Sequence, residues 1–339
     1  MDGAGRPQNF GWSRQPDFLY ESPAIWTQAR KISSVDRYIV FSPSHTVVFE
    51  LRDDGYLGRA SVTVASQKDK KRSTHAARSL FPFGACGLPP GSKSGAARFR
   101  KKGAALDFVP MEGGARIIRA DFLGHGSARS IRGELVLSEP ASPGGAAESI
   151  ACNLPWPNDK SAFECFRCSP WYTAEGIVQL GTMEIVFSRG NSWGIFDWSR
   201  GSRPRSDARH WASACGIASD SAGASRLVGF CVGHGTEDGS SGTKSAFFVD
   251  GRLHKLDQIT FHAPRADQPS LWRFTASDSR LEMAFAPHQE RADRQRVLFR
   301  SFSRRQLFGK FSGKAVLDDG SEIDFANISG IAERVKTRF

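Results

Sequence analysis

Short stretches of alternating apolar and polar residues dominate the chain, and no long stretch shows the three-and-four spacing of an amphipathic helix. Between Tyr38 and Phe49 two β-rich runs flank a Ser-Pro-Ser turn, and from Tyr56 to Ala65 the apolar residues recur with a period of two. This pattern predicts strands. Further strands are predicted at 104–109, 115–122, 130–137, 182–187, 226–232, 245–249, 258–262, 272–276, 280–285 and 297–302.

Asp-Gly pairs separate several of these runs. Gly55 and Gly320 each follow an aspartate between β-prone segments, and so does Gly251. An Asp-Gly pair supplies the positive φ angles that a two-residue type I′ turn needs. Phe248 to Leu256 is therefore predicted to be a hairpin that turns at Asp250-Gly251.

The domain organisation follows from length and from one candidate linker. A chain of 339 residues is long for a single core, so two domains are expected. Residues 139–147 are rich in Pro, Gly and Ala and form the best linker candidate. We predict an N-terminal arm at 1–30, a first β-domain at 31–145 and a second at 146–339. The fold class is all-β, with each domain a barrel or a strongly bent sandwich.

Composition and charge exclude several classes of protein. A hydrophobic content of 40% with 25 Phe and 8 Trp excludes disorder. The net charge of +11 is spread along the chain without a recognised nucleic-acid module, so specific nucleic-acid binding is not expected. No signal-like or membrane-spanning apolar run is visible, so no transmembrane segment is expected. Six cysteines without a signal peptide indicate reduced thiols in the cytoplasm.

The motifs that would hold a metal or a cofactor are incomplete. Cys165 and Cys168 form a single C-x-x-C with no second ligand pair, so two ordinary thiols are favoured over a zinc site. The glycine-rich segment 233–242 lacks the Gly-Lys-Ser/Thr of a phosphate loop and is interpreted as a loop over a pocket. We therefore expect neither a metal nor a cofactor.

An ordered set of phrases then points to a family. From Ala24 to Phe339 the chain resembles the bacterial domain-of-unknown-function 2804 family. More distantly, it resembles the paired lipocalin-like folds of carotenoid hydratases and tocopherol cyclases. The resemblance implies two lipocalin-like (calycin-type) domains and brings no assigned reaction. The phrases that carry it are DGYLG at 54–58, FPFG at 81–84, NLPW at 153–156, GIFDWSRG at 194–201, WASACG at 211–216, FVDGRLHKL at 248–256, QLFGKFSG at 306–313 and LDDG at 317–320.

The chain also departs from the family pattern. Where the family has Thr-Glu-Asn before the Phe-Val-Asp-Gly hairpin, this chain has Thr243-Lys244-Ser245. The family's His before Gln-Val-Phe-Gly is Arg305, and its closing Trp is Phe339. If the missing Glu and Asn serve a reaction in other members, this protein has lost or altered it.

Three residues are candidates for catalysis. Asp197 and Arg200 flank Trp198 in a glycine-bounded segment and are expected to contact each other or a shared partner, either at a cavity mouth or as an internal ion pair. His254 follows the Asp250-Gly251 turn. It is either an acid or base, or a histidine that is hydrogen-bonded within the hairpin, and we favour the second interpretation.

The expected ligand is a small, mostly apolar molecule, which could carry an acidic group. We predict a cavity in the C-terminal half lined by aromatic residues drawn from Trp198, Trp211, Phe230 and Phe248. Three functions stay open. One is a cofactor-free hydratase, cyclase or isomerase with Asp197 as acid and Arg200 as its orienter, and its main rival is a non-catalytic binding protein. The third is an interaction protein that uses its basic surface. A buried carboxyl group with a raised pKa at the cavity would favour the enzyme.

Overall fold

The computed structural model describes residues 9–16, 20, 32–82, 86–124, 129–140, 142, 145–156, 159–220, 223–235, 241–262, 264 and 271–338. These residues form strands and one 3-10 helix, η2 (Glu112–Gly114). The strands are β1 Gly11–Ser13, β2 Ile32–Phe41, β3 His45–Asp53, β4 Leu57–Ser66, β5 Arg72–Leu80, β6 Ala97–Lys101, β7 Ala104–Pro110, β8 Arg116–Phe122, β9 Ile131–Ser138, β10 Ile150–Trp156, β11 Asp159–Leu180, β12 Met183–Phe187, β13 Trp193–Ser202, β14 Ser206–Asp220, β15 Ser225–His234, β16 Ala246–Val249, β17 Arg252–Lys255, β18 Ile259–His262, β19 Trp272–Ala276, β20 Leu281–Val297, β21 Arg300–Val316 and β22 Glu322–Arg338.

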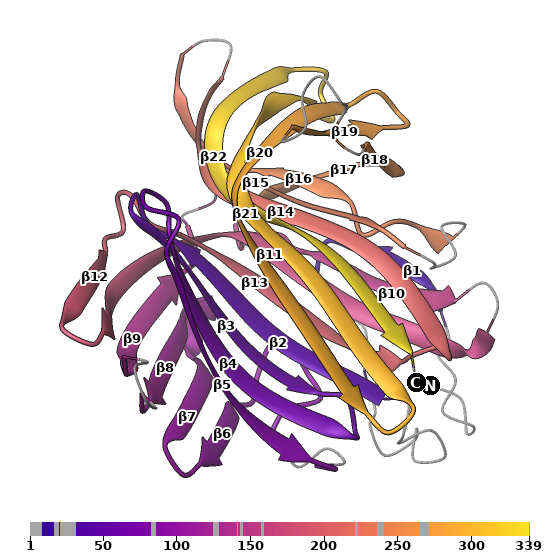
Figure 1. Ribbon diagram of the computed structural model, residues 1–339. Coiled ribbons are helices and arrows are strands. Elements are labelled where there is room, and N and C mark those ends of the chain that lie inside the picture. The colour runs from indigo at the N-terminus through magenta and orange to yellow at the C-terminus, as the bar shows by residue number, and fades with distance from the viewer. Residues whose placement is uncertain are drawn as a thin grey trace.

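The strands form two antiparallel sheets, which confirms the all-β prediction (Figure 1). The first sheet runs β5-β4-β3-β2-β13-β11-β9-β8-β7-β6, with β1, β10 and β12 attached at its side. It curves until β4 approaches β7. The second sheet runs β17-β16-β15-β14-β22-β21-β20-β19-β18. Strands β20, β21 and β22 are long enough to belong to the curved upper part of the second sheet and to cover the first sheet below it (Figure 1).

The chain passes from the first sheet to the second between Ser202 and Ser206. Strands β10 to β13 follow the predicted linker but pair within the first sheet, where β13 pairs β2 and β11 pairs β9. The predicted division at residues 145 and 146 therefore does not coincide with the sheet boundary. A domain can contain strands of more than one sheet, so the division into two domains at residues 145 and 146 remains a prediction.

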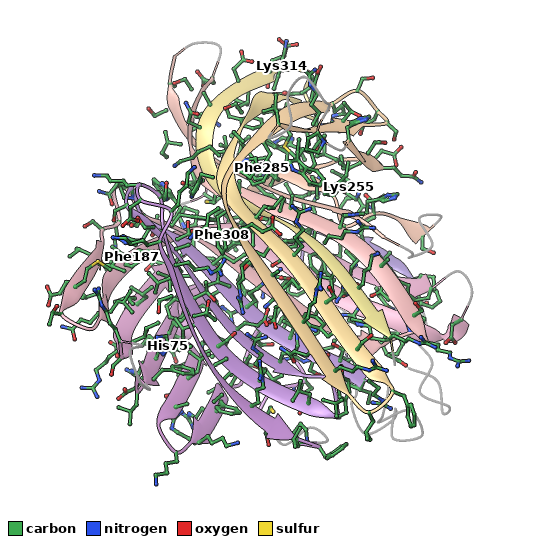
Figure 2. The ribbon with its side chains drawn as sticks, in the orientation of Figure 1. His75, Phe187, Lys255, Phe285, Phe308 and Lys314 are labelled. Atoms are coloured by element: carbon green, nitrogen blue, oxygen red, sulfur yellow. The ribbon has the colours of Figure 1, made fainter. Side chains whose placement is uncertain are left out.

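Two apolar cores lie on the two sides of the second sheet. One fills the first sheet and the space between the sheets, and the other fills the upper part of the second sheet. Phe308 belongs to the first core and Phe285 to the second, and both are labelled in Figure 2. Phe285 stacks on Phe311 with ring centroids 4.2 Å apart. Leu307 and Phe308, neighbours on β21, belong to different cores, so the second sheet is buried on both faces there.

The family-like phrases of the last third are neighbours in the second sheet. Gln306 pairs with Glu333 and Gly309 with Gly330 across β21 and β22, and Trp211 on β14 pairs with the same Glu333. Two phrases that are far apart in sequence, WASACG on β14 and QLFGKFSG on β21, therefore lie on either side of β22.

The predicted hairpin at Asp250-Gly251 is confirmed. Val249 pairs with Arg252 across the turn, and φ is 47° at Asp250 and 78° at Gly251. Positive φ at both central residues is the geometry of the type I′ turn.

No helix within the described part of the chain is long and apolar enough to cross a membrane.

Candidate functional site

The inner wall of the first sheet carries a group of buried polar side chains. Because successive residues of a strand point to opposite faces, Asp36 and Tyr38 of β2 lie on the inner face while Arg37 lies on the outer one. Arg200 of β13 reaches the same inner face. Each of these residues is at least 93% buried. Such burial of charged groups requires close partners.

Asp36 and Arg200 form an ion pair with 2.6 Å between carboxylate Oδ1 and guanidinium Nη2. Arg200 also donates to the carbonyl oxygens of Pro89 at 2.8 Å and Val35 at 2.9 Å, and its guanidinium lies 4.8 Å from the Trp198 ring. Burial raises the pKa of Asp36, although Arg200 pulls this pKa down. A carboxyl group in this state holds its proton at higher pH than an exposed aspartate does.

Two more arginines lie beside this pair. Arg116 of β8 donates to the carbonyl oxygen of Ser92 at 2.7 Å and to the Tyr38 hydroxyl at 3.4 Å. Arg167 of β11 donates to the same Ser92 carbonyl at 3.3 Å. Three arginines of the barrel wall thus hold the loop that connects β5 to β6 through its backbone carbonyls.

A small cavity of about 10 Å³ lies between this loop and the wall. Asp36 and Arg116 line it together with an aromatic group, and Pro89 and Ser92 close it. The aromatic group is tightly packed, because Tyr38 stacks on Phe196 at 4.8 Å and meets Phe108 edge-on at 4.7 Å. The cavity has room for one water molecule. A larger molecule requires displacement of the loop.

Asp197 lies on the opposite face of β13 from Arg200, between the two sheets. Its carboxylate pairs with Arg37 at 2.5 Å, and Arg37 also pairs with Glu333 of β22 at 2.6 Å. Burial raises the pKa of Asp197, and Arg37 opposes the shift. The structure therefore does not bring Asp197 and Arg200 together, and each has its own partner.

The pair of Arg37 and Asp197 belongs to a larger intersheet network of buried charges. Arg304 of β21 binds Glu50 of β3, and Arg59 of β4 binds Asp293 of β20. Burial raises the pKa of Glu50, but Arg304, Arg52 and Arg37 together hold this pKa well below its usual range. Both of these contacts, like the pair of Arg37 and Glu333, join the first sheet to the second. These ion pairs link the two sheets.

His254 of β17 is half-buried in the second sheet. Its Nδ1 accepts a hydrogen bond from the backbone N–H of Asp318 at 3.1 Å, and burial lowers the pKa of the imidazole. The hydrogen bond thus goes to the turn between β21 and β22. His254 belongs to the second sheet, whereas Asp36 belongs to the first. A catalytic role for His254 stays a prediction.

The four predicted ligand-binding aromatics lie in separate places. Trp198 is on the inner wall beside Arg200, and Trp211 stacks on Arg37 between the sheets at 4.5 Å. Phe230 belongs to the core of the second sheet and Phe248 to the core between the sheets. The structure does not bring these four side chains together, and none of them lines the cavity at Asp36.

The departure from the family pattern at Lys244 has a structural counterpart. Lys244 pairs with Glu164 of β11 and lies 5.5 Å from the Phe166 ring. Glu164 also pairs with Arg203 at 3.0 Å and Arg209 at 3.1 Å, and these cations hold its pKa well below the usual range against desolvation. Lys244 is one of three cations around a single buried carboxylate. Part of the glycine-rich loop, 236–240, lies outside the described residues.

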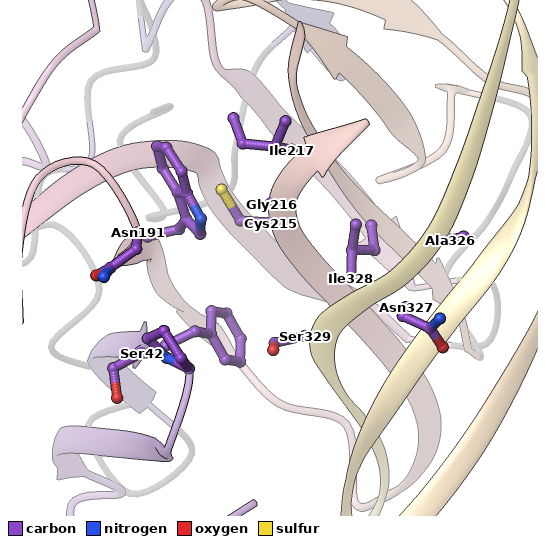
Figure 3. Close-up of a pocket in the computed structure, with 12 residues that line it drawn as sticks. Ser42, Asn191, Cys215, Gly216, Ile217, Ala326, Asn327, Ile328 and Ser329 are labelled. Atoms are coloured by element: carbon purple, nitrogen blue, oxygen red, sulfur yellow. The ribbon is translucent and has the colours of Figure 1, made fainter. Parts of the chain in front are cut away.

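A second cavity is a crevice lined by residues of both sheets (Figure 3). It has a volume of about 140 Å³ and lies where the pairing of β14 with β22 is interrupted between Ala214 and Ser219. Cys215 and Ile328 line it, and Phe41 and Trp193 form its aromatic wall. Burial raises the pKa of the Cys215 thiol. The lining contains no carboxylate, no basic side chain and none of the four predicted aromatics, so it offers no acid of the kind that Asp36 supplies.

All six cysteines are free and buried. In the part of the chain that the structure describes, no three His, Cys, Asp or Glu side chains gather as a metal site would require. The prediction of folding without metal stays a prediction.

Comparison with known proteins identifies the family. The family model for the domain of unknown function DUF2804 matches residues 1–339. The chain belongs to the DUF2804 family. This confirms the resemblance found in the sequence, and no curated protein matches the chain in sequence.

Solved structures show that this DUF2804 protein has a lipocalin-like fold, as predicted. CghA matches with a TM-score of 0.55 at 10% identity, over 91% of this chain and 88% of that one. CghA with Sch210972 matches with a TM-score of 0.53 at 10% identity, over 91% and 89%. Kievitone hydratase from Nectria haematococca matches with a TM-score of 0.50 at 8% identity, over 98% and 97%. At these identities the likeness describes the fold.

Sequence reasoning missed Asp36, Arg116 and Arg167. One signal was available, because Asp36 and Arg37 interrupt a strand that is otherwise apolar from Val35 to Phe41. Adjacent charges in a strand that is buried on both faces must each find a partner inside the protein. No comparable signal marks Arg116 or Arg167.

Proposed function

We propose that this protein is a cofactor-free enzyme, a hydratase, cyclase or isomerase, that acts on a small, mostly apolar molecule at the inner wall of the first sheet. The observation that carries the proposal is the Asp36 carboxyl group, which faces a cavity with aromatic walls and has a raised pKa. Arg200 fixes the position of this carboxyl group. Our proposal gives the acid role to Asp36 in place of Asp197, because Asp197 faces the intersheet network and does not line the cavity.

The three reactions share one requirement, a proton donor in a site that excludes bulk water. In the hydratase version, the Asp36 carboxyl group gives its proton to one carbon of a C=C bond. Water forms a C–O bond with the other carbon and loses a proton to the Asp36 carboxylate, which restores the acid. Activity should fall as the pH rises through the raised pKa of Asp36, since only the protonated form donates.

The names of the similar structures support a role in small-molecule chemistry. One of them is named a hydratase, and another was crystallised with Sch210972. We extend the same kind of small-molecule role to this chain. The rival function is a binding protein that holds its ligand in the same place without reaction.

Incorporation of deuterium tests the proposal even though the substrate is unidentified. The protein would be incubated in heavy water with the apolar extract of the cells that produce it, and the extract would be searched for deuterated products by mass spectrometry. We expect products with the wild type and none with Asp36→Asn, which keeps the shape of the side chain. Asp121→Asn, at an exposed ion pair with Arg132, serves as the control and should stay active. Equal activity of Asp36→Asn and the wild type would refute the role of Asp36, and a bound ligand without deuterium would establish the rival.

A further inference from the structure

Arg116 and Arg167 are buried charges that the proposed reaction leaves unused. Each residue is only 6% exposed, and both guanidinium groups lie over the Phe196 ring, at 4.4 Å and 5.6 Å from its centroid. Two like charges so close together in a dry interior repel each other, and burial of either one costs free energy without an anion beside it. Burial and the neighbouring Arg116 lower the pKa of Arg167, whereas Tyr38 and Tyr172 raise the pKa of Arg116 against burial.

Neither guanidinium group has a matching anion. Both donate to the one carbonyl oxygen of Ser92, and the Nε of each is buried without a hydrogen-bond partner. Among the described residues, no carboxylate lies within ion-pair distance of either arginine. Glu139 faces the pair at longer range and is half-buried, and burial raises its pKa. The neutral carbonyl of Ser92 is therefore a poor substitute for a negatively charged group.

We propose that Arg116 and Arg167 bind the carboxylate of an apolar carboxylic acid, and that the Ser92 carbonyl occupies this site when no ligand is bound. The proposal rests on the proposed function and names its substrate class. A carboxylate presents two acceptor oxygens, so it can satisfy both guanidinium groups at once.

The rest of the ligand would contact the aromatic wall. Tyr38, Phe108 and Phe196 line the cavity, and their packed rings offer an apolar surface to a chain or ring attached to the carboxylate. At about 10 Å³ the cavity is too small for such a molecule, so the segment from Pro89 to Ser92 must leave. A bound carboxylate near Asp36 would favour the protonated form of that acid, because like charges disfavour each other.

Isothermal titration calorimetry with three matched probes tests the head group. Decanoic acid, methyl decanoate and decanol share one chain length, and only decanoic acid ionises to an anion near neutral pH. We expect decanoate to bind, and the ester and alcohol to bind roughly tenfold or more weakly, the scale of hydrogen bonds to a charged group. Arg116→Gln and Arg167→Gln should each remove this preference. Arg119→Gln is the matched control, because Arg119 lies on the same strand, β8, with its side chain 50% exposed in a pair with Glu134.

A second variant tests whether the segment that carries Ser92 competes with decanoate for the arginines. This variant should bind decanoate more tightly, whereas the arginine variants should bind it more weakly. Pro90 lies in the segment that covers the cavity, and Pro90→Gly makes this segment more flexible. Because the open state gains entropy, we expect decanoate to bind about two- to fivefold more tightly. Pro43→Gly, in the turn between β2 and β3, should leave decanoate binding unchanged. The gain should depend on Arg116, because decanoate bound to apolar surface that unfolding exposes would not need this guanidinium group.

The outcomes separate this inference from the proposed function. Equal affinity for decanoate and its ester, or no binding of decanoate, overturns the carboxylate site, and Asp36-dependent deuterium incorporation would then still support the enzyme. Decanoate binding that depends on Arg116 without any deuterium incorporation supports the site and overturns the enzyme. Unchanged affinity in Pro90→Gly refutes the displacement of Ser92.

Discussion

Arg37 joins the two sheets through two carboxylates at once. It pairs with Asp197 in its own sheet and with Glu333 in the other, and it stacks on Trp211. Removal of one member of a buried ion pair leaves an uncompensated charge behind. We predict that Arg37→Gln lowers the free energy of unfolding by about 3–5 kcal/mol, measured by urea denaturation.

The control for this prediction is Arg132→Gln. Arg132 pairs with Asp121 at the surface and its side chain is 67% exposed, so its loss should cost less than about 1 kcal/mol. A loss in Arg37→Gln as small as that in the control would show that the intersheet network does not hold the sheets together.

The buried carboxylates predict a specific loss of stability in acid. Neighbouring cations hold the pKa of Glu50 and Glu164 well below the usual range and lower that of Glu333, in each case against desolvation. A depressed pKa contributes stability above the unfolded-state value of about 4.3, and this contribution is lost as the pH falls through the folded pKa. Asp36 and Asp197, with raised pKa values, behave oppositely and lose their contribution as the pH rises.

A comparison of the wild type with Glu50→Gln isolates this effect. We predict that the difference in unfolding free energy between the two proteins is largest near neutral pH and shrinks below about pH 4.5, as Glu50 becomes protonated in the unfolded wild type. Urea titrations between pH 7 and pH 3.5 would measure it. A difference that stays constant over this range would mean that the pKa of Glu50 is the same in the folded and unfolded protein, so that its neighbours do not stabilise the ionised form.

At the residue scale, the sequence indicated one member of the site and missed the rest. Arg200 was a candidate, but the three-residue spacing from Asp197 already places the two on opposite faces of a strand. Which face meets the other sheet and which meets the interior could not be read, because both faces of β2 and β13 are buried. Asp36 therefore received no role from the sequence.

At the scale of elements, cross-strand glycines of the second sheet let an aromatic ring pack directly on the backbone. Gly309 and Gly330 are cross-strand partners, and Gly309 also pairs with Pro287 of β20, next to an irregularity in that strand. A Cβ atom added at Gly330 would lie 2.6 Å from the Ala214 Cβ and 2.7 Å from the Phe311 ring. The close approach of ring and backbone requires glycine here.

Gly330→Ala should therefore destabilise the protein. We predict a loss of about 1–3 kcal/mol from overpacking, measured by urea or thermal unfolding. Gly190→Ala is the matched control, because nothing lies within 4 Å of its added Cβ. If both variants unfold alike, Gly330 does not set the packing of β22 on Phe311.

The positions of the strands were predicted more accurately than their lengths. The segments predicted at 104–109 and 272–276 correspond to β7 and β19. The predicted strand at 280–285 continues to Val297 in the structure. Charged residues after 286 resemble a loop in sequence, but Arg291 and Asp293 point into the intersheet network. Long-range pairing partners make such residues part of a strand, and a local pattern does not contain that information.

At the scale of the whole molecule, the connection between the sheets differs from the predicted linker. A glycine- and proline-rich run marks a flexible connection, but strands β10 to β13 beyond it pair back into the first sheet. Sheet membership depends on partners more than a hundred residues away, as in the pairing of Asp197 with Arg37. The resemblance to the family predicted the fold, because the lipocalin-like fold that it implies includes such long-range pairings.

The central claim is that the ligand binds at the inner wall of the first sheet, and photoaffinity labelling tests it most directly. A decanoic acid analogue with a diazirine on its chain would be bound, irradiated and mapped by peptide mass spectrometry, with excess decanoate as competitor. We predict competable labels on the cavity wall at Tyr38, Phe108 and Phe196. Labels confined to the crevice between the sheets, at Ile217 and Ile328, would contradict the claim.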